Sequence, residues 1–164
     1  MQRLISLAPI ATPDARLLML GSMPGAASLL KKQYYAYAHN HFWPLICAAL
    51  NERDPGTYED RIAMLLRCNI ALWDVIQSCL REGSLDKDIK EAVPNDILSF
   101  LQAHPALKTV CFNGTAAQRM YDRHFQRLDG IRYLLLPSSS PVPRQKIKVL
   151  ADKMPAWAEI GRYL

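Results

Sequence analysis

This chain of 164 residues lacks long apolar runs, and that absence excludes a membrane-spanning protein. No segment approaches the roughly 18–20 consecutive apolar residues that a bilayer-spanning helix needs. The N-terminal residues also lack the charged, apolar and small-residue order of a signal peptide. We therefore expect a cytoplasmic protein (nucleoid-associated in a prokaryote) that does not bind membranes.

Closely spaced cysteines are also missing, which argues against a metal centre. Zinc and iron–sulfur sites usually show close spacing such as CxxC, whereas Cys47, Cys68, Cys79 and Cys111 are isolated in mostly apolar surroundings. We interpret all four as reduced thiols of the core. The sequence predicts no metal and no cofactor.

The loop at residues 21–25, Gly-Ser-Met-Pro-Gly, lacks the features of common nucleotide-binding loops. It has neither the lysine of a Walker loop nor the GxGxxG spacing of a dinucleotide site, so binding of nucleoside triphosphates or NAD is disfavoured. Pro24 and the two glycines end the preceding apolar run. Loops of this kind bring backbone N–H groups close to a ligand, which is often anionic.

The chain does contain an alternation of strand and helix patterns along one domain, residues 1–164. Short apolar runs bounded by turn residues predict parallel strands at Leu17–Leu20, Ile70–Val75, Thr109–Phe112 and Ile131–Leu136. Helical spacing occupies the connections, with a last helix from about Arg144 to Tyr163 that Pro155 should kink or break. This order predicts an α/β fold in which helices cover both faces of a four-stranded parallel sheet.

A second loop, residues 136–141 (Leu-Pro-Ser-Ser-Ser-Pro), follows the last apolar run. Ligands of open parallel sheets bind outside the carboxyl ends of the strands, so the two loops should face one crevice. The hydroxyls of Ser138, Ser139 and Ser140 can bind phosphate together with a helix N-terminus. Val142 lies between two prolines, where it suits a wedge that enters a base stack; packing within the turn explains it equally well.

Positive charge gathers beside both loops. The chain carries 20 basic and 15 acidic residues, which gives a net charge of +5. Lys31 and Lys32 follow the first loop, and Arg144, Lys146 and Lys148 follow the second. This distribution favours a polyanionic partner, and a solvated basic face is the alternative.

An aromatic segment lies between the first loop and the helical pattern that begins near Phe42. Residues 34–43 contain five aromatic side chains, two histidines and Asn40. Flat rings beside a glycine loop suit stacking on a nucleobase, and an aromatic cluster beneath the loop is the alternative. A hydrolytic triad of Ser138, His39 and Asp74 is disfavoured, because no GxSxG elbow surrounds the serine.

Taken together, these segments resemble the uracil-DNA glycosylase superfamily, and specifically its hypoxanthine-DNA (deoxyinosine) glycosylase branch. The resemblance covers nearly the whole chain in family order: GSMPGAASL, YYAYAHNHFW, ALWDVIQSC with GSLD, CFNGTAA and LLLPSSSP. It implies a three-layer α/β/α fold and an enzyme of base excision repair that flips a deaminated base out of DNA and hydrolyses its N-glycosidic bond. Hypoxanthine is the expected base. A uracil- or mismatch-specific glycosylase and an inactive DNA-binding module are the alternatives.

The resemblance also assigns roles to residues. Asn40 is implied as the catalytic residue, because Met23 stands where many members place a water-activating Asp or Asn. The implied base-binding residues are Tyr35, which would stack on the flipped base, Met23, Asp74 and Asn113. The implied DNA-binding residues are Ser22, Gly25, Ser138, Ser139, Ser140, Val142, Arg144 and Lys146. A capping role for Asn40, and a structural or capping role for Asp74, remain open.

The chain departs from the family pattern in places. Leu136 stands where classical uracil enzymes have a catalytic His, which argues against their electrophilic mechanism. Tyr37-Ala38 replaces a common His-Pro, and Ser138-Ser139-Ser140 replaces Ser-Thr-Ser. No lysine lies at a matched catalytic position, so we expect a monofunctional enzyme without a Schiff base. The expected partner is DNA containing deaminated bases, bound by a monomer.

Overall fold

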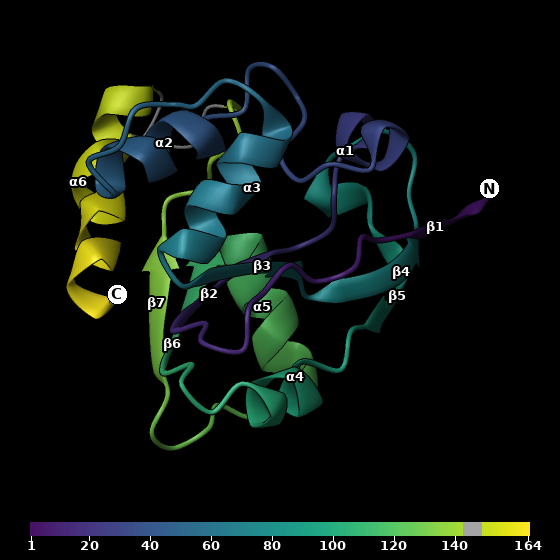
Figure 1. The fold of residues 1–164 in the computed structure, drawn as a ribbon. Helices are drawn as coiled ribbons and strands as arrows, with labels where there is room; N and C mark the ends of the chain where they lie inside the picture. The colour runs from purple at the N-terminus through teal and green to yellow at the C-terminus, as the bar shows by residue number, and fades with distance from the viewer. Residues whose placement is uncertain (143–148) are drawn as a thin grey trace.

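The computed structural model describes residues 1–142 and 149–164, and the predicted parallel sheet is present in them (Figure 1). Its strands are β2 (Leu17–Gly21), β3 (Ile70–Asp74), β6 (Thr109–Asn113) and β7 (Arg132–Leu136), in the order β3-β2-β6-β7. Each strand contains most of the apolar run that predicted it. The central strand β2 is buried along its whole length, as expected for a parallel strand with helices on both faces.

Helices fill the connections between these strands, as the periodicity predicted. They are α1 (Ala26–Lys31), α2 (Phe42–Ala49), α3 (Tyr58–Arg67), α4 (Ile97–Ala103), α5 (Thr115–His124) and α6 (Leu150–Ala158). Thr57 caps α3 by accepting a hydrogen bond from the Asp60 N–H at 3.2 Å, and Asp96 caps α4 in the same way. The connection from β2 to β3 therefore holds α2 and α3 after the short helix α1.

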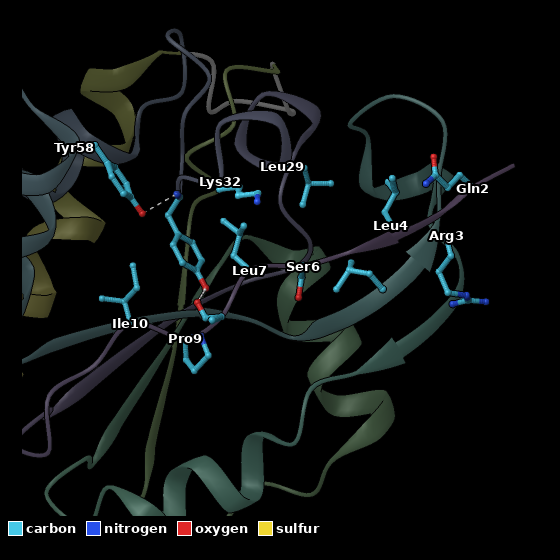
Figure 2. Close-up of a pocket in the computed structure, with 13 residues that line it drawn as sticks. Gln2, Arg3, Leu4, Ser6, Leu7, Pro9, Ile10, Leu29, Lys32 and Tyr58 are labelled. Carbon is cyan, nitrogen blue, oxygen red and sulfur yellow. Dashed lines mark hydrogen bonds between the residues drawn. The ribbon is translucent and has the colours of Figure 1, made fainter.

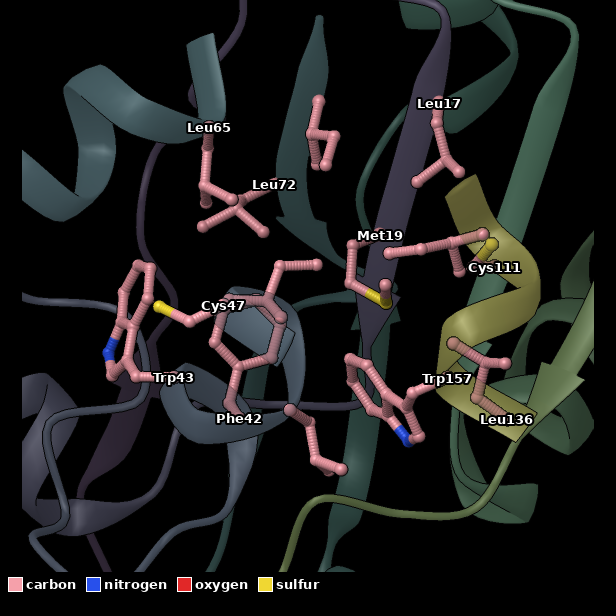
Figure 3. Close-up of a cluster of buried hydrophobic side chains, with 14 of the residues drawn as sticks. Leu17, Met19, Phe42, Trp43, Cys47, Leu65, Leu72, Cys111, Leu136 and Trp157 are labelled. Atoms are coloured by element: carbon pink, nitrogen blue, oxygen red, sulfur yellow. The ribbon is translucent and has the colours of Figure 1, made fainter. Parts of the chain in front are cut away.

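Alternate side chains of β2 divide the core into two layers. Leu17 and Met19 pack against α2, α3 and α6, and Figure 3 shows both side chains in one cluster with Trp157 of α6. Leu18 and Leu20 pack against α4 and α5 on the opposite face. The fold is therefore the predicted three-layer α/β/α arrangement.

The structure also contains a second sheet that the sequence analysis missed. Strands β1 (Arg3–Ile5), β4 (Ile76–Leu80) and β5 (Lys90–Pro94) form a three-stranded antiparallel sheet in the order β1-β4-β5. Strand β4 begins almost directly after β3, so the two strands read as one apolar run in the sequence. A short 3-10 helix, η1 (Asp86–Asp88), lies in the hairpin between β4 and β5.

The sequence predicted a kink or a break at Pro155, and the break is wrong. Helix α6 continues through Pro155 to Ala158 and is followed by the 3-10 helix η2 (Glu159–Tyr163). Buried Trp157 and Ile160 anchor the chain beyond the proline, so packing compensates for the lost N–H donor. The expected start of this helix, with the basic residues Arg144, Lys146 and Lys148, lies outside the described residues.

Two expectations from composition can be compared with the described residues. Cys47, Cys79 and Cys111 are buried free thiols as expected, whereas Cys68 is partly exposed. Within residues 1–142 and 149–164, no helix is long and apolar enough to cross a membrane.

Candidate functional site

The parallel strands bring Gly21, Asp74, Asn113 and Leu136 to one edge of the sheet. Gly21 pairs with Asp74 between β2 and β3, and Asn113 pairs with Leu136 between β6 and β7. The two loops singled out in the sequence both begin at this edge, because Gly21 and Leu136 are the last residues of β2 and β7. This is the edge where parallel α/β sheets bind their ligands.

Asn113 connects the loop at residues 137–141, called the Ser loop below, to the aromatic segment. Its Oδ1 accepts a hydrogen bond from the Ser139 N–H at 2.8 Å. Its Nδ2 donates to Ser139 Oγ at 2.9 Å and to the Tyr35 hydroxyl at 3.1 Å. Both amide protons are therefore used within the protein, and the contacts of the described residues leave one lone pair on Oδ1 for a ligand.

Tyr35 occupies the space between the two loops. One face of its ring stacks on Phe42, with 3.8 Å between the centroids and 13° between the planes. Its φ of +53° is uncommon for a bulky residue, which indicates that its neighbours fix the backbone here. Burial, and then the charge of Asp74, raises the pKa of Tyr35 far above its ordinary value. The hydroxyl therefore keeps its proton and remains a donor.

Asp74 is a buried carboxyl group next to the start of the first loop. The residue is 4% exposed, and its Oδ2 has no hydrogen-bond partner among the described residues. Burial raises the pKa of Asp74 to about 7; Asp86 adds to the rise, and Arg81 opposes it. A Cβ at position 21 would overlap Asp74 Oδ1, so any larger residue there would displace the buried carboxyl group. Strand β4 follows Asp74, which excludes the helix-cap interpretation.

Three hydrogen bonds connect the loop at residues 21–25, called the Gly loop below, to the β4–β5 hairpin. They join Ser22 Oγ to Asp86 Oδ1 (2.5 Å), the Ala26 N–H to Ser84 Oγ (2.9 Å), and the buried Arg81 guanidinium to the Pro24 carbonyl. Ser22 therefore directs its hydroxyl to the hairpin, and Met23 is only 6% exposed. Gly25 also faces the hairpin, since a Cβ there would lie 3.5 Å from Ser84 Oγ.

Asn40 lies directly before His41, the N-cap of α2, and beside the Ser loop. Its Oδ1 accepts a hydrogen bond from the first N–H of the helix, that of Phe42, at 2.9 Å; the N-cap residue is His41, so Asn40 supports the start of α2 through a side-chain turn and not as its N-cap. The next residue, His41, joins the main chain at this point to the Ser loop, because the His41 N–H donates to the Ser139 carbonyl at 2.9 Å. The described contacts leave Nδ2 and a second lone pair on Oδ1 available.

The three serines of the Ser loop take different positions. Ser139 is 1% exposed and is held by Asn113, so its side chain faces the protein interior. Ser138 Oγ accepts from the Ser140 N–H at 3.1 Å, and Ser140 Oγ accepts from the Val142 N–H at 3.4 Å. Val142 is 47% exposed, which leaves an apolar side chain in contact with solvent at the end of this loop.

The disfavoured hydrolytic triad is not assembled in the described part of the chain. His39 is exposed and packs its ring against Tyr37, at 5.4 Å between centroids. No hydrogen bond within residues 1–142 and 149–164 joins His39 to Ser138 or to Asp74.

Sequence reasoning missed Lys153 of α6, which lies behind the Ser loop. It is 3% exposed, and its Nζ lies 3.0 Å from His41 Nδ1 and 2.9 Å from the Ser140 carbonyl oxygen. Burial lowers the pKa of Lys153. Its sequence signal is its spacing, because Lys153, Trp157 and Ile160 recur on one helical face that the structure buries.

A separate groove lies away from this edge of the sheet. It has a volume of about 760 Å³ and lies along residues 2–10, with Leu29, Lys32 and Tyr58 also in its lining (Figure 2). Tyr34 also lines it, and its hydroxyl donates to the Ala8 carbonyl at 2.7 Å. Lys32 lines this groove and is also one of the basic residues that the sequence linked to a polyanionic partner, whereas Asn40 and the Ser loop do not line it.

Comparisons with known proteins identify the family of this chain. The profile of the Uracil DNA glycosylase superfamily matches residues 8–161. The chain belongs to the uracil DNA glycosylase superfamily. Among relatives in this superfamily, it is 34% identical to the hypoxanthine DNA glycosylase of Methanosarcina barkeri, over 92% of this chain and 93% of that one. It is 33% identical to the protein of the same name from Methanosarcina acetivorans, over 92% of both chains.

A solved structure from the same superfamily confirms the fold. The solution NMR structure of a candidate uracil DNA glycosylase from Methanosarcina acetivorans superposes with a TM-score of 0.84. The two chains are 31% identical, and the match covers 98% of each. The resemblance found in the sequence is therefore confirmed at the level of the superfamily and its fold.

The first prediction concerns Gly114, which allows the Ser loop to approach β6. Gly114 has a φ of +93°, and a Cβ there would lie 2.8 Å from Ser138 Cβ. Backbone strain in Gly114→Ala should therefore lower the free energy of unfolding by about 1–3 kcal/mol. The overlap of the new Cβ with Ser138 should lower it further. Gly130→Ala is the matched control, because Gly130 has a φ of +79° but no atom within 4 Å of a Cβ. Equal losses in urea unfolding would show that the Ser loop does not constrain Gly114.

The second prediction concerns the buried acid of this superfamily site. The folded pKa of Asp74, about 7, exceeds its usual 3.8, so the folded state binds the proton more tightly and wild-type stability falls as pH rises from 4 to 7. Asp74→Asn should therefore be more stable than the wild type at pH 8, by on the order of 2–4 kcal/mol, with a smaller gain at pH 4. Asp14→Asn, at an exposed position, is the control. If the free energies of unfolding of the wild type and Asp74→Asn change with pH in the same way, the raised pKa of Asp74 is contradicted.

Proposed function

We propose that this protein is a monofunctional DNA glycosylase of base excision repair that releases hypoxanthine from deoxyinosine in DNA. The observation that carries the proposal is the position of Asn40, whose amide is oriented by the start of α2 and whose segment is bound to the Ser loop. The names of two relatives support hypoxanthine as the base. We further propose that the enzyme acts as a monomer in the cytoplasm.

Base recognition is assigned to the groups between the two loops. A flipped base would stack on the face of Tyr35 opposite to Phe42, a contact worth about 1–3 kcal/mol. Above its pKa of about 7, Asp74 is ionised and can accept a hydrogen bond from the ring N–H of hypoxanthine. The free lone pair of Asn113 Oδ1 offers a second acceptor.

Cleavage then depends on positioning rather than on a strong base. The bond between the sugar C1′ and the base nitrogen breaks through an oxocarbenium-like sugar, and water supplies the new oxygen on C1′. Met23 and Leu136 are apolar and cannot activate water or polarise the base. The available lone pair of Asn40 Oδ1 can hold the water beneath C1′, with the amide dipole directed at the developing positive charge.

Binding of the DNA backbone is assigned to the Ser loop and to nearby positive charge. Ser138 and Ser140 are partly exposed and can offer hydroxyl groups to a phosphate. Val142 is exposed at the end of the loop, where it can enter the base stack left by the flipped nucleotide. Lys31 and Lys32 are exposed beside the Gly loop and suit phosphate contacts.

The third prediction tests the substrate. Duplexes carrying one inosine, uracil or xanthine, and an undamaged duplex as the control, are incubated with the enzyme and then treated with alkali. We expect an abasic site from inosine, and a strand break only after alkali, because no lysine is assigned to attack the sugar. Product from uracil alone would refute the hypoxanthine assignment, and no product from any duplex would favour a DNA-binding module without activity.

The fourth prediction tests Asn40. Asn40→Ala should reduce single-turnover cleavage of inosine-containing DNA by about 10²–10³-fold, the typical effect of removing one preorganised group. The dissociation constant for the same DNA should change little, because the amide acts on the water rather than on the duplex.

Asn40→Ser is the control for the contact with the start of α2. A serine hydroxyl can accept from the same N–H two residues on, although more weakly than asparagine, so this variant should keep part of the stability that Asn40→Ala loses. It lacks the amide and should remain as slow in cleavage as Asn40→Ala. Wild-type cleavage by Asn40→Ser would show that Asn40 only supports the start of α2, and the backbone of the Gly loop would then be the next candidate to position water.

A further inference from the structure

We propose that Lys153 is a positioning residue that fixes the Asn40–His41 segment against the Ser loop through two directed hydrogen bonds. The proposal rests on the proposed function, in which Asn40 positions the water. Lys153 belongs to α6, which no motif of the sequence assigned to the site.

The geometry joins three segments that lie far apart in the chain. The ammonium group of Lys153 lies 3.0 Å from His41 Nδ1 and 2.9 Å from the Ser140 carbonyl oxygen. The backbone completes the connection, because the His41 N–H donates to the Ser139 carbonyl at 2.9 Å. The residue next to Asn40 is therefore held by its main chain and by its side chain at the same loop.

The contact also determines where the imidazole of His41 carries its proton. An ammonium group can only donate, so Nδ1 accepts and the ring proton of neutral His41 must lie on Nε2. Burial and the positive charge of Lys153 both lower the pKa of His41, which favours the neutral ring. His41 is thus a neutral residue in one tautomer, with one remaining N–H donor at Nε2.

Packing alone does not explain a lysine at this position. Lys153 is 3% exposed, and burial of an ammonium group between neutral acceptors costs free energy that an apolar side chain would not. Trp157, on the same face of α6, already anchors the helix, and its Nε1 donates to the Pro137 carbonyl at 2.9 Å. What Lys153 adds is a pair of donors directed at the loop and at His41.

The fifth prediction compares Lys153→Met with Lys108→Met. Methionine keeps an unbranched apolar stem but has no donor, so cleavage of inosine-containing DNA under single-turnover conditions should fall at least tenfold. The dissociation constant of the complex should change less than threefold, since Lys153 is buried. Lys108 precedes β6 and is exposed at the opposite edge of the sheet. Lys108→Met removes the same charge and should cleave like the wild type.

Two further measurements separate positioning from a loss of structure. Ring ¹⁵N shifts of His41 should show the proton on Nε2 in the wild type, and a mixture of tautomers in Lys153→Met. His41→Phe removes the acceptor but keeps a ring, so its cleavage defect should not add to that of Lys153→Met in the double variant. If Lys153→Met does not fold, His41→Phe alone should still show the tenfold loss.

The outcomes distinguish this proposal from the proposed function. Equal cleavage by Lys153→Met and Lys108→Met, with an unchanged His41 tautomer, would overturn the role of Lys153. A wild type that releases no hypoxanthine would refute the proposed function instead. In that case two measurements still test the contact: the His41 tautomer, and the thermal stabilities of Lys153→Met, His41→Phe and the double variant. If the stability losses of the two single variants add up in the double variant, the contact between Lys153 and His41 is overturned.

Discussion

The site depends on one side chain, Asn113, which holds the carboxyl edge of the sheet together. Its amide forms hydrogen bonds with the main chain and side chain of Ser139 and with the Tyr35 hydroxyl. Gly114 lets the Ser loop come this close, because any Cβ there would press on Ser138. The Ser139 carbonyl then receives the N–H of His41, so the position of the preceding Asn40 follows from contacts made at the end of β6.

The charges beneath the Gly loop impose a cost in stability that the site requires. Asp74 Oδ2 and two nitrogens of Arg81 are buried without a hydrogen-bond partner in the described part of the chain. Each unsatisfied buried group costs about 1–3 kcal/mol. Arg81 also donates to the Pro24 carbonyl, so the same group that offsets the charge of Asp74 fixes the loop. Such an arrangement suits a pocket for a polar ring better than one for an apolar ligand.

The sequence predicted the sheet well and the second sheet not at all, for a physical reason. Parallel strands covered on both faces are continuous apolar runs, so β2 and β6 stand out in the chain. The antiparallel strand β4 follows β3 after one residue, Val75, and the two merge into one pattern. Local motifs likewise placed both loops at one sheet edge. They could not show that Ser22 and Ser139 direct their hydroxyls into the protein, because the partners, Asp86 and Asn113, are distant in sequence.

The apolar residues at two positions of the site explain why such distant contacts matter. The resemblance places Met23 where many members of the superfamily have an Asp or Asn, and Leu136 where classical uracil enzymes have a His; neither apolar side chain can supply proton transfer or charge. A neutral amide such as Asn40 is a weak acceptor, and its contribution depends on the angle and distance at which it holds water. Precision of this kind comes from the groups that fix its backbone. In this protein those groups include the His41 main chain and buried Lys153, so the proposed catalysis by Asn40 would require the Ser loop, α2 and α6 to be held in one arrangement.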